Sequence, residues 1–319
     1  MTELDSRSLP VLLKKLDEKI YFYPNPGNAG DSLIACATFQ FFEKHNVNYE
    51  IVADGNFDGT GKTVVYGGGG NFGGEESRAG RFVRKYKDSV KNLVFMPHTI
   101  FGAEELLASL KENTYLVCRE RVSYEFVSKH ASTANVFLHD DIVFQADVNA
   151  LLREKPSVNF IPYLLRESKS KLKAGSNYDF GLSLNGFLTY NFHRAKKKLG
   201  LTSKGKVLQA FRVDVERTSD VVPPGNVDLS AVLELSSCQK SLAELSCYSF
   251  LSEINAFEEV YTDRLHIGIA AALLGKRVKL YANNYYKIRA IYEYSIKDKF
   301  PNVEWCVREP LIKSSPNMR

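Results

Sequence analysis

Residues 261–280, YTDRLHIGIAAALLGKRVKL, constrain the fold more than any other stretch of the chain. Residues 259–261 are typical of a strand end, and the apolar run that starts at Leu265 predicts a buried helix. Gly275 predicts the end of that helix, and residues 278–281 predict the next strand. A strand, a buried helix and a second strand in such close succession predict an α/β fold with parallel strands.

Two basic side chains stand where this helix begins. Thr262 and Asp263 are typical N-cap residues, so we expect Arg264 and His266 to lie in the first helical turn. Backbone N–H groups and the helix dipole favour an anion at that position. A guanidinium and an imidazole there indicate a site for a phosphate or carboxylate with a proton donor beside it. A plain buried crossover helix is the alternative that these residues leave open.

Size and charge narrow the possible functions. The chain has 319 residues, more than one compact core usually holds, so we expect one large or two medium α/β domains. Its net charge of +5 at pH 7 suits an anionic small substrate or a peripheral membrane contact and is too weak to indicate nucleic acid. The five cysteines form no C-x-x-C pair and no residues have metal-ligand spacing, so we expect a reducing compartment and no metal or other cofactor.

The beginning of the chain carries no recognisable targeting signal. It lacks the apolar segment of a signal peptide, and no apolar run is long enough to span a bilayer. We therefore expect a cytoplasmic protein, with any membrane contact peripheral and at the inner face of the membrane. Residues 5–19 predict a short amphipathic helix, which we interpret as a helix that packs on the domain.

A turn-forming stretch, PNPGNAGDSLI at residues 24–34, follows a predicted strand at residues 19–23. A strand, a tight turn and a helix start can cradle an anionic or hydroxyl-rich ligand at the carboxyl edge of a parallel sheet. The stretch matches neither the dinucleotide fingerprint nor the P-loop, so a structural turn and a binding turn stay equally open. Its turn residues and the predicted cap of a helix to about residue 45 are Gly27, Asn28, Gly30, Asp31 and Ser32.

A second glycine-rich stretch, GGGGNFGG at residues 67–74, follows the predicted strand at residues 63–66. Consecutive glycines lose much backbone entropy when they are ordered, so a specific demand usually accounts for them. Either backbone amides around Gly69, Gly70 and Asn71 face a ligand, or the loop packs very closely against another loop. A flexible linker is the third interpretation, which the position directly after a strand disfavours.

Polar residues recur at the ends of successive predicted strands, including those at residues 92–96, 115–118 and 136–138. Because the carboxyl ends of parallel strands share one edge of a sheet, we predict that these residues line one rim of a cleft. The predicted rim consists of Gly27, Asn28, Gly30, Asp31, Gly69, Gly70, Asn71, His98 and Asp141, with Arg119 beside them.

The middle of the chain differs in character from its two ends. Residues 151–205 are polar and basic with weak periodicity, and we interpret them as a linker and acceptor-side segment. They would connect an N-terminal Rossmann-like domain (1–150) to a smaller C-terminal Rossmann-like domain (206–319). The lysine run at residues 196–198 is typical of a solvated helix face; attraction to anionic lipid or to a diphosphate-linked substrate is the alternative.

Six motifs, in order along the chain, resemble the polysaccharide pyruvyl transferase family. They are GNAGDSLI, YGGGGNFGG, MPHTI, CRERVSYE, LHDDI and TDRLHIGIAAALLGKRVKLYANNYYKIRAIYEY. The resemblance covers most of residues 19–297, and the last motif is the most specific of the six.

This resemblance implies a GT-B-like architecture, in which two Rossmann-like domains face each other across a cleft. It also implies transfer of pyruvate from phosphoenolpyruvate to two hydroxyls of a sugar, which forms a cyclic ketal, releases phosphate and contributes to exopolysaccharide or cell-surface glycan synthesis. The family's donor pocket corresponds here to Arg264, Leu265 and His266, and either Arg212 or Arg119 is expected to supply a further guanidinium. We expect the acceptor sugar to belong to a lipid-linked oligosaccharide repeat unit.

The chemistry of the residues agrees with that implication. Phosphoenolpyruvate carries a phosphate and a carboxylate, for which guanidinium groups and helix-start amides are suitable ligands. We assign His266 as the general acid for the methylene carbon and expect Asp31 or Asp141 to take protons from the sugar hydroxyls. His98 stands where relatives more often carry Gln, so a polar contact is altered there.

Two other functions remain open at this point. A glycosyltransferase of the GT-B type would use a nucleotide-sugar, but the second half of the chain has no convincing acidic pair for a ribose. A non-catalytic glycan-binding relative would keep the fold without turnover, and the pair of Arg264 and His266 argues against it.

Overall fold

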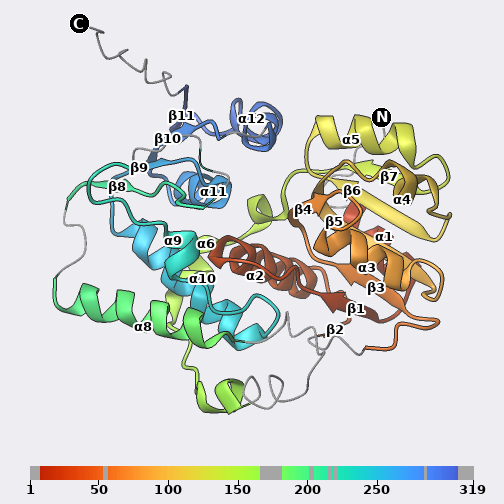
Figure 1. The fold of residues 1–319 in the computed structure, drawn as a ribbon, viewed down its shortest axis with the longest axis horizontal. Coiled ribbons are helices and arrows are strands. Elements are labelled where there is room, and N and C mark those ends of the chain that lie inside the picture. Colours follow the sequence, from red (N-terminus) through yellow and green to blue (C-terminus); the bar gives the residue numbers. More distant parts are fainter. Residues whose placement is uncertain are drawn as a thin grey trace, which may run out of the picture.

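Two parallel sheets form the framework of the molecule (Figure 1). The computed structural model describes residues 8–52, 57–165, 182–200, 205–214, 217, 222–283 and 286–307. Within that part, sheet A has seven strands in the order β2-β1-β3-β5-β6-β7 with β4 also paired to β5, and sheet B has the order β11-β10-β9-β8. All these pairings are parallel, which confirms the predicted α/β class. The strands are β1 (Ile20–Tyr23), β2 (Tyr49–Ile51), β3 (Thr63–Tyr66), β4 (Gly69–Gly73), β5 (Asn92–Phe101), β6 (Thr114–Cys118), β7 (Asn135–Leu138), β8 (Val207–Gln209), β9 (Glu259–Thr262), β10 (Arg277–Tyr281) and β11 (Val303–Cys306).

Helices cover sheet A and fill the space between the two sheets (Figure 1). A 3-10 turn (Ile142–Gln145) follows β7, and a π-helical turn (Tyr292–Ile296) continues α12. The helices are α1 (Ser8–Leu16), α2 (Ala29–Lys44), α3 (Arg78–Tyr86), α4 (Glu104–Ala108), α5 (Arg121–His130), α6 (Val148–Arg153), α8 (Leu184–Lys198), α9 (Leu229–Val232), α10 (Lys240–Asn255), α11 (Leu265–Leu273) and α12 (Lys287–Ile291).

The larger hydrophobic core extends from sheet A to sheet B. It includes Phe22 and Val94 of sheet A together with Val260 and Leu280 of sheet B. Helices α2 and α10 pack against each other between the sheets and contribute apolar side chains to this core (Figure 1). Burial of each large apolar side chain stabilises the fold by about 1.5–3 kcal/mol. The shared packing therefore couples the position of one sheet to that of the other.

A second core lies on the opposite face of sheet A. Successive side chains of a strand point to opposite faces, so Val64 and Tyr66 of β3 enter this core, whereas Val65 enters the larger one. Phe82 of α3 and Val127 of α5 pack into the second core from outside the sheet. Sheet A is thus covered on both faces, as parallel sheets usually are, and its carboxyl edge remains available to a ligand.

The glycine-rich stretch and the strand beside it differ from the prediction. Residues 69–73 form β4, where the sequence predicts a loop, and β5 continues through Pro97 and His98, where the sequence predicts an end at residue 96. The pairing of β5 with β6 shifts register between Phe95 and His98. Such an irregularity accommodates a proline inside a strand, because the missing N–H then falls outside the regular ladder.

The predicted linker contains regular structure where it is described. Helix α6 ends within it, residues 161–165 are helical, and α8 fills residues 184–198. Residues 166–181 and 201–204 lie outside the described part, as do residues 1–7 at the start of the helix predicted for residues 5–19. Among the helices that the structure describes, none is both long enough and apolar enough to cross a bilayer.

Candidate active site

A cavity of about 180 Å³ is lined by residues from both sheets. Several of them lie in the loops just after the carboxyl ends of β1, β6, β8, β9 and β10, which is the edge where parallel α/β sheets bind ligands. The others come from β4, α2, α9, α11 and α12. The lining residues are Asn25, Pro26, Asn28, Asp31, Gly70, Asn71, Arg119, Arg212, Ser230, Arg264, Leu265, His266, Asn283, Lys287 and Ile288.

The N-terminus of α2 forms the side of the cavity that belongs to sheet A. The Oδ1 atom of Asn28 accepts a hydrogen bond from the N–H of Gly30 at 2.8 Å, and Oδ2 of Asp31 accepts one from the N–H of Asn28 at 2.9 Å. This capping box starts the helix at Ala29, so the predicted cap at Asp31 and Ser32 is wrong. The side chains of Asn28 and Asp31 therefore cap the start of α2, and both residues also line the cavity.

The Asp31 carboxylate is the acidic group of this helix start. Its Oδ1 atom accepts a hydrogen bond from Nδ2 of Asn25 at 3.0 Å. Burial raises the pKa of Asp31 above its ordinary value, although the nearby His266 acts in the opposite direction. A carboxylate with a raised pKa is a stronger proton acceptor than an ordinary surface aspartate.

The glycine-rich stretch packs too closely against its neighbours to carry side chains. A Cβ atom on Gly67 would lie 2.6 Å from the backbone nitrogen of Asn25. One on Gly70 would lie 2.6 Å from Nη2 of Arg119 and 3.0 Å from Nζ of Lys287. Close packing therefore accounts for these glycines, and the flexible-linker interpretation is wrong. At Gly70, the absence of a side chain lets two cations reach the cavity beside the backbone.

His98 lies beneath this stretch and is fully buried, so it supports the cavity without lining it. Its Nδ1 atom donates to the carbonyl oxygen of Gly67 at 3.2 Å, and its Nε2 atom accepts from the N–H of Asn71 at 3.3 Å. Burial, followed by the charge of Arg119, lowers the pKa of His98 to about 3, so the ring is neutral at physiological pH. His98 thereby holds Asn71, whose Nδ2 atom donates to Oδ1 of Asn25 at 2.5 Å.

A buried carboxylate connects Arg119 to His266. Asp141 Oδ2 accepts a hydrogen bond from Nη1 of Arg119 at 2.7 Å and lies 3.4 Å from Nε2 of His266. Asp141 is 1% exposed, and its Oδ1 atom accepts from the N–H of Val143 at 3.0 Å. Burial alone would raise the pKa of Asp141, but the hydrogen bond with His266 and the charge of Arg119 outweigh it and hold the pKa well below its usual range. Asp141 is therefore a fixed anion that orients two cavity-lining side chains, Arg119 and His266.

Arg264 occupies the N-cap position of α11, which begins at Leu265, so the predicted cap at Thr262 and Asp263 is wrong. The Oγ1 atom of Thr262 accepts a hydrogen bond from the N–H of Arg264 at 2.9 Å and fixes the backbone just before the helix. His266 follows in the first turn of α11, as predicted, and both side chains line the cavity.

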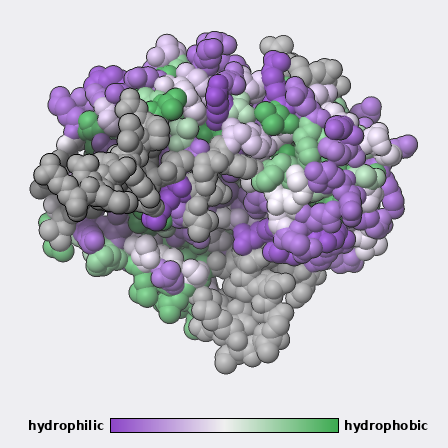
Figure 2. Space-filling model, turned by 45° about the horizontal axis from the view of Figure 1, so that its top comes forward, coloured by the Kyte–Doolittle hydropathy of each residue, from purple (hydrophilic) through white to green (hydrophobic). Residues whose placement is uncertain are grey.

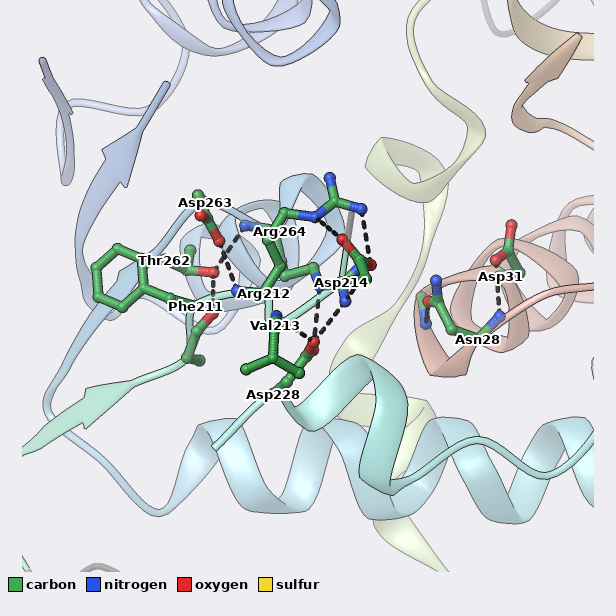
Figure 3. Close-up of polar contacts among 12 residues, drawn as sticks. Asn28, Asp31, Phe211, Arg212, Val213, Asp214, Asp228, Thr262, Asp263 and Arg264 are labelled. Carbon is green, nitrogen blue, oxygen red and sulfur yellow. Dashed lines mark hydrogen bonds and ion pairs between the residues drawn. The ribbon is translucent and has the colours of Figure 1, made fainter. Parts of the chain in front are cut away.

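Two carboxylates hold the guanidinium groups of the sheet B side (Figure 3). Asp228 accepts from Nε and Nη2 of Arg264 at 3.0 and 2.5 Å, and Asp214 accepts from the same Nη2 at 2.8 Å. Arg212 donates from Nε and Nη2 to Asp214 at 2.7 and 3.0 Å. The side chain of Asp228 is 3% exposed and that of Asp214 is 41% exposed. Asp228 is therefore a buried support, whereas Asp214 is an accessible carboxylate that shares its two arginines with the cavity.

Some lining residues were missed by the sequence reasoning. Asn25 follows β1 after Pro24, and Lys287 begins α12, the helix that comes after β10. Both obey the rule that polar residues gather after strand ends, so that rule could have identified them.

The cavity brings together much of the predicted site. All five predicted donor-site residues line it, namely Arg119, Arg212, Arg264, Leu265 and His266, and so do Asn28, Asp31, Gly70 and Asn71 of the predicted rim. Gly27, Gly30, Gly69, His98 and Asp141 are not among its lining residues. Across the residues that the structure describes, no group of three or more His, Cys, Asp or Glu side chains is arranged to hold a metal ion.

Comparisons with known proteins place this geometry in context. A family model described as polysaccharide pyruvyl transferase matches residues 28–285. The crystal structure of an uncharacterized protein from Klebsiella pneumoniae subsp. pneumoniae is similar to this chain, with 26% sequence identity and a TM-score of 0.71. The similarity covers 96% of this chain and 99% of that one. No curated protein matches the chain.

Proposed function

Because the chain belongs to the polysaccharide pyruvyl transferase family, we propose that it transfers pyruvate from phosphoenolpyruvate to two hydroxyls of one sugar residue. The reaction forms a cyclic ketal and releases phosphate, as a step in the synthesis of a bacterial exopolysaccharide or cell-surface glycan. The observation that carries this proposal is the convergence of three guanidinium groups and one imidazole on a single cavity.

The donor matches the charges of the cavity. Phosphoenolpyruvate presents a phosphate and a carboxylate on one carbon, and cationic groups reach the cavity from both sides. Arg119 belongs to the sheet A side, whereas Arg212 and Arg264 belong to the sheet B side. Each charge-assisted hydrogen bond contributes about 1.5–3 kcal/mol. We assign all three arginines and Lys287 to donor binding. The sequence left either Arg212 or Arg119 as the further donor-binding arginine, and the proposal includes both.

We assign the first proton transfer to His266. Protonation of the methylene carbon leaves C2 cationic, and one sugar hydroxyl then adds to it. Phosphate leaves, and the second hydroxyl closes the ring. One proton enters the new methyl group and one leaves with phosphate, so the two hydroxyl protons balance the reaction without a redox cofactor. Asp141 supports this role because a fixed anion 3.4 Å from Nε2 of His266 stabilises the protonated imidazole.

We assign the removal of the hydroxyl protons to Asp31. It lines the cavity and its pKa is raised by burial, whereas Asp141 is buried and has a lowered pKa. Asn28 and Asn71 line the same side of the cavity, where amide groups suit the hydroxyls of a sugar acceptor.

We extend the proposal to the architecture and the location. A GT-B-like arrangement would place residues 1–150 and 206–319 as two Rossmann-like domains around the cavity, with residues 151–205 as the connecting acceptor-side segment. The two parallel sheets and the cavity lined by both support it. The acceptor would be a lipid-linked oligosaccharide repeat unit at the cytoplasmic face of the membrane.

The test is phosphate release from phosphoenolpyruvate in the presence of a panel of free and lipid-linked glycosides. The proposal predicts release that depends on both donor and acceptor. Release of nucleoside diphosphate from a nucleotide-sugar would instead establish a glycosyltransferase. Binding of a glycoside without consumption of either donor would establish a glycan-binding protein.

The variant His266→Ala sharpens the test. We expect it to abolish turnover while phosphoenolpyruvate still binds, because the arginines remain; His130→Ala on α5 serves as the matched control. Arg264→Ala should weaken donor binding by roughly 1.5–3 kcal/mol. Full turnover by His266→Ala would contradict the assigned proton donor.

A further inference from the structure

Large exposed hydrophobic side chains are concentrated in one region of the chain. Of the eleven in the described residues, eight lie between residues 161 and 222. Single exposed apolar residues are ordinary, but a contiguous set marks a contact surface. The eight are Ile161, Leu165, Leu184, Leu188, Phe192, Leu199, Val213 and Val222.

Helix α8 aligns several of these side chains. Leu184, Leu188 and Phe192 recur every four residues along the helix, so they share one face. Residues 161–165 lie beside the helix, because the ring of Phe160 packs 5.0 Å from that of Phe187. Figure 2 shows hydrophobic residues gathered at the lower left of the molecule, the side on which α8 lies in Figure 1. The helix therefore presents an apolar stripe to solvent.

Cations border this stripe. Lys196 and Lys198 are exposed in the last turn of α8, and Nζ of Lys196 lies 4.5 Å from the centroid of the Phe192 ring. Lys155 lies near Arg194 and Lys198. Burial, followed by the charges of these two side chains, lowers the pKa of Lys155. We define the α8 surface as this apolar and basic group: Ile161, Leu165, Leu184, Leu188, Phe192 and Leu199, with Lys155, Arg194, Lys196 and Lys198.

The α8 surface continues toward the candidate active site. Phe192 lines a groove of about 500 Å³ together with Val213 and Asp228. Asp228 also holds Arg264 of the cavity. A partner bound at the α8 surface would therefore lie beside this groove, one wall of which, Asp228, also contacts Arg264.

We propose that the α8 surface binds an anionic lipid bilayer. The apolar stripe would enter the boundary between headgroups and acyl chains, and the bordering lysines and arginine would contact lipid phosphates. An apolar face with basic residues at its border complements that layer in both polarity and charge. Because α8 is an amphipathic helix of fifteen residues, it would lie in the plane of the membrane. This inference concerns where the protein binds and does not depend on the proposed reaction.

Flotation of the full chain with lipid vesicles tests the inference. We expect binding to vesicles of phosphatidylcholine mixed with phosphatidylglycerol, weaker binding to phosphatidylcholine alone, and loss of the difference at high salt. The double variant Leu188→Ser/Phe192→Ser should weaken binding at least about tenfold, because two large apolar side chains no longer enter the bilayer. Lys196→Glu/Lys198→Glu should remove the preference for anionic vesicles.

Matched controls separate this surface from general effects. Val11→Ser removes an exposed apolar side chain on α1, and Lys129→Glu reverses an exposed charge on α5; both should bind vesicles as the parent does. Absence of vesicle binding, or binding unchanged in both double variants, would overturn the inference. A dimer interface is the other outcome: the parent protein would bind no vesicles, sedimentation would show a dimer, and Leu188→Ser/Phe192→Ser would abolish that dimer. This result too would overturn the inference. Phosphate release with free glycosides reports separately on the reaction.

Discussion

Two carboxylates that differ in burial hold the arginines of the proposed donor site. Asp228 is buried and orients Arg264 from behind, whereas Asp214 is 41% exposed and contacts both Arg264 and Arg212. An incoming phosphate or carboxylate needs the same guanidinium groups. Under the proposed function, Asp214 would therefore compete with the donor for the two arginines, whereas Asp228 would hold Arg264 in place for it.

The two carboxylates should consequently give opposite effects when neutralised. We expect Asp214→Asn to tighten phosphoenolpyruvate binding by up to about fivefold, because a competing negative charge disappears. Asp228→Asn should weaken it about tenfold, because Arg264 loses its buried counter-charge. Isothermal titration with phosphoenolpyruvate measures both. Weaker binding in Asp214→Asn would show that this carboxylate positions the arginines instead.

His98 makes the fold sensitive to acid. In the unfolded chain its pKa is near 6.5, whereas in the folded protein burial lowers the pKa to about 3. Between these values the unfolded state binds more protons, so the free energy of unfolding decreases as the pH falls. One such group contributes at most about 1.4 kcal/mol per pH unit.

The variant His98→Gln removes this proton-binding group and keeps one donor and one acceptor for Gly67 and Asn71. We expect its free energy of unfolding, measured by urea titration from pH 7 to pH 4, to depend less steeply on pH than that of the parent. Parallel slopes would show that the His98 ring is not held neutral in the fold.

The helix starts of α2 and α11 meet at Gly30 and His266. A Cβ atom on Gly30 would lie 3.1 Å from both Cβ and Nδ1 of His266 and 3.0 Å from Oδ1 of Asn28. Contacts of that length require a neighbour to move, and the neighbours here belong to the site. The close approach of α2 and α11 thus depends on glycine, which has no side chain, at position 30.

Gly30→Ala should therefore reduce kcat by about tenfold or more while the fold is retained, because it would displace His266, the proposed proton donor. Gly268→Ala in α11 is the matched control, because the atoms nearest to its Cβ atom all belong to the side chain of Leu280, the first of them at 3.0 Å. Phosphate release and thermal unfolding of both variants measure the effect. Equal activity of the two would contradict a tight fit between α2 and α11.

Sequence patterns predicted the existence of helices and strands better than the residues at which they begin and end. The position of α11 follows from its apolar run and Gly275, but its cap does not, because Thr262 binds the backbone of Arg264 and leaves Arg264 itself at the N-cap. Strand β4 could not be predicted from propensity, because glycine is disfavoured in strands. The glycines of this stretch are explained by the atoms that pack closely against Gly67 and Gly70, which the sequence does not reveal. Local signals locate an element, and tertiary contacts decide its boundaries.

At the scale of the whole molecule, the site depends on long-range pairs. The rule that polar residues follow parallel strands predicted that Arg119 and Asp31 share an edge of sheet A. No local pattern could predict that Asp141 of the sheet A side would contact His266 of the sheet B side, or that Asp228 would hold Arg264. Those contacts arise because α2 and α10 pack the two sheets onto one core.

Mass analysis of the acceptor tests the central claim most directly. Purified protein is incubated with phosphoenolpyruvate and a glycoside that supports phosphate release. The molecular mass of the recovered glycoside is then measured by mass spectrometry. Pyruvyl transfer predicts a gain of one pyruvate less one water, with both hydroxyls blocked, and no gain with His266→Ala. An unmodified glycoside after phosphate release, or the same gain with His266→Ala, would contradict the account.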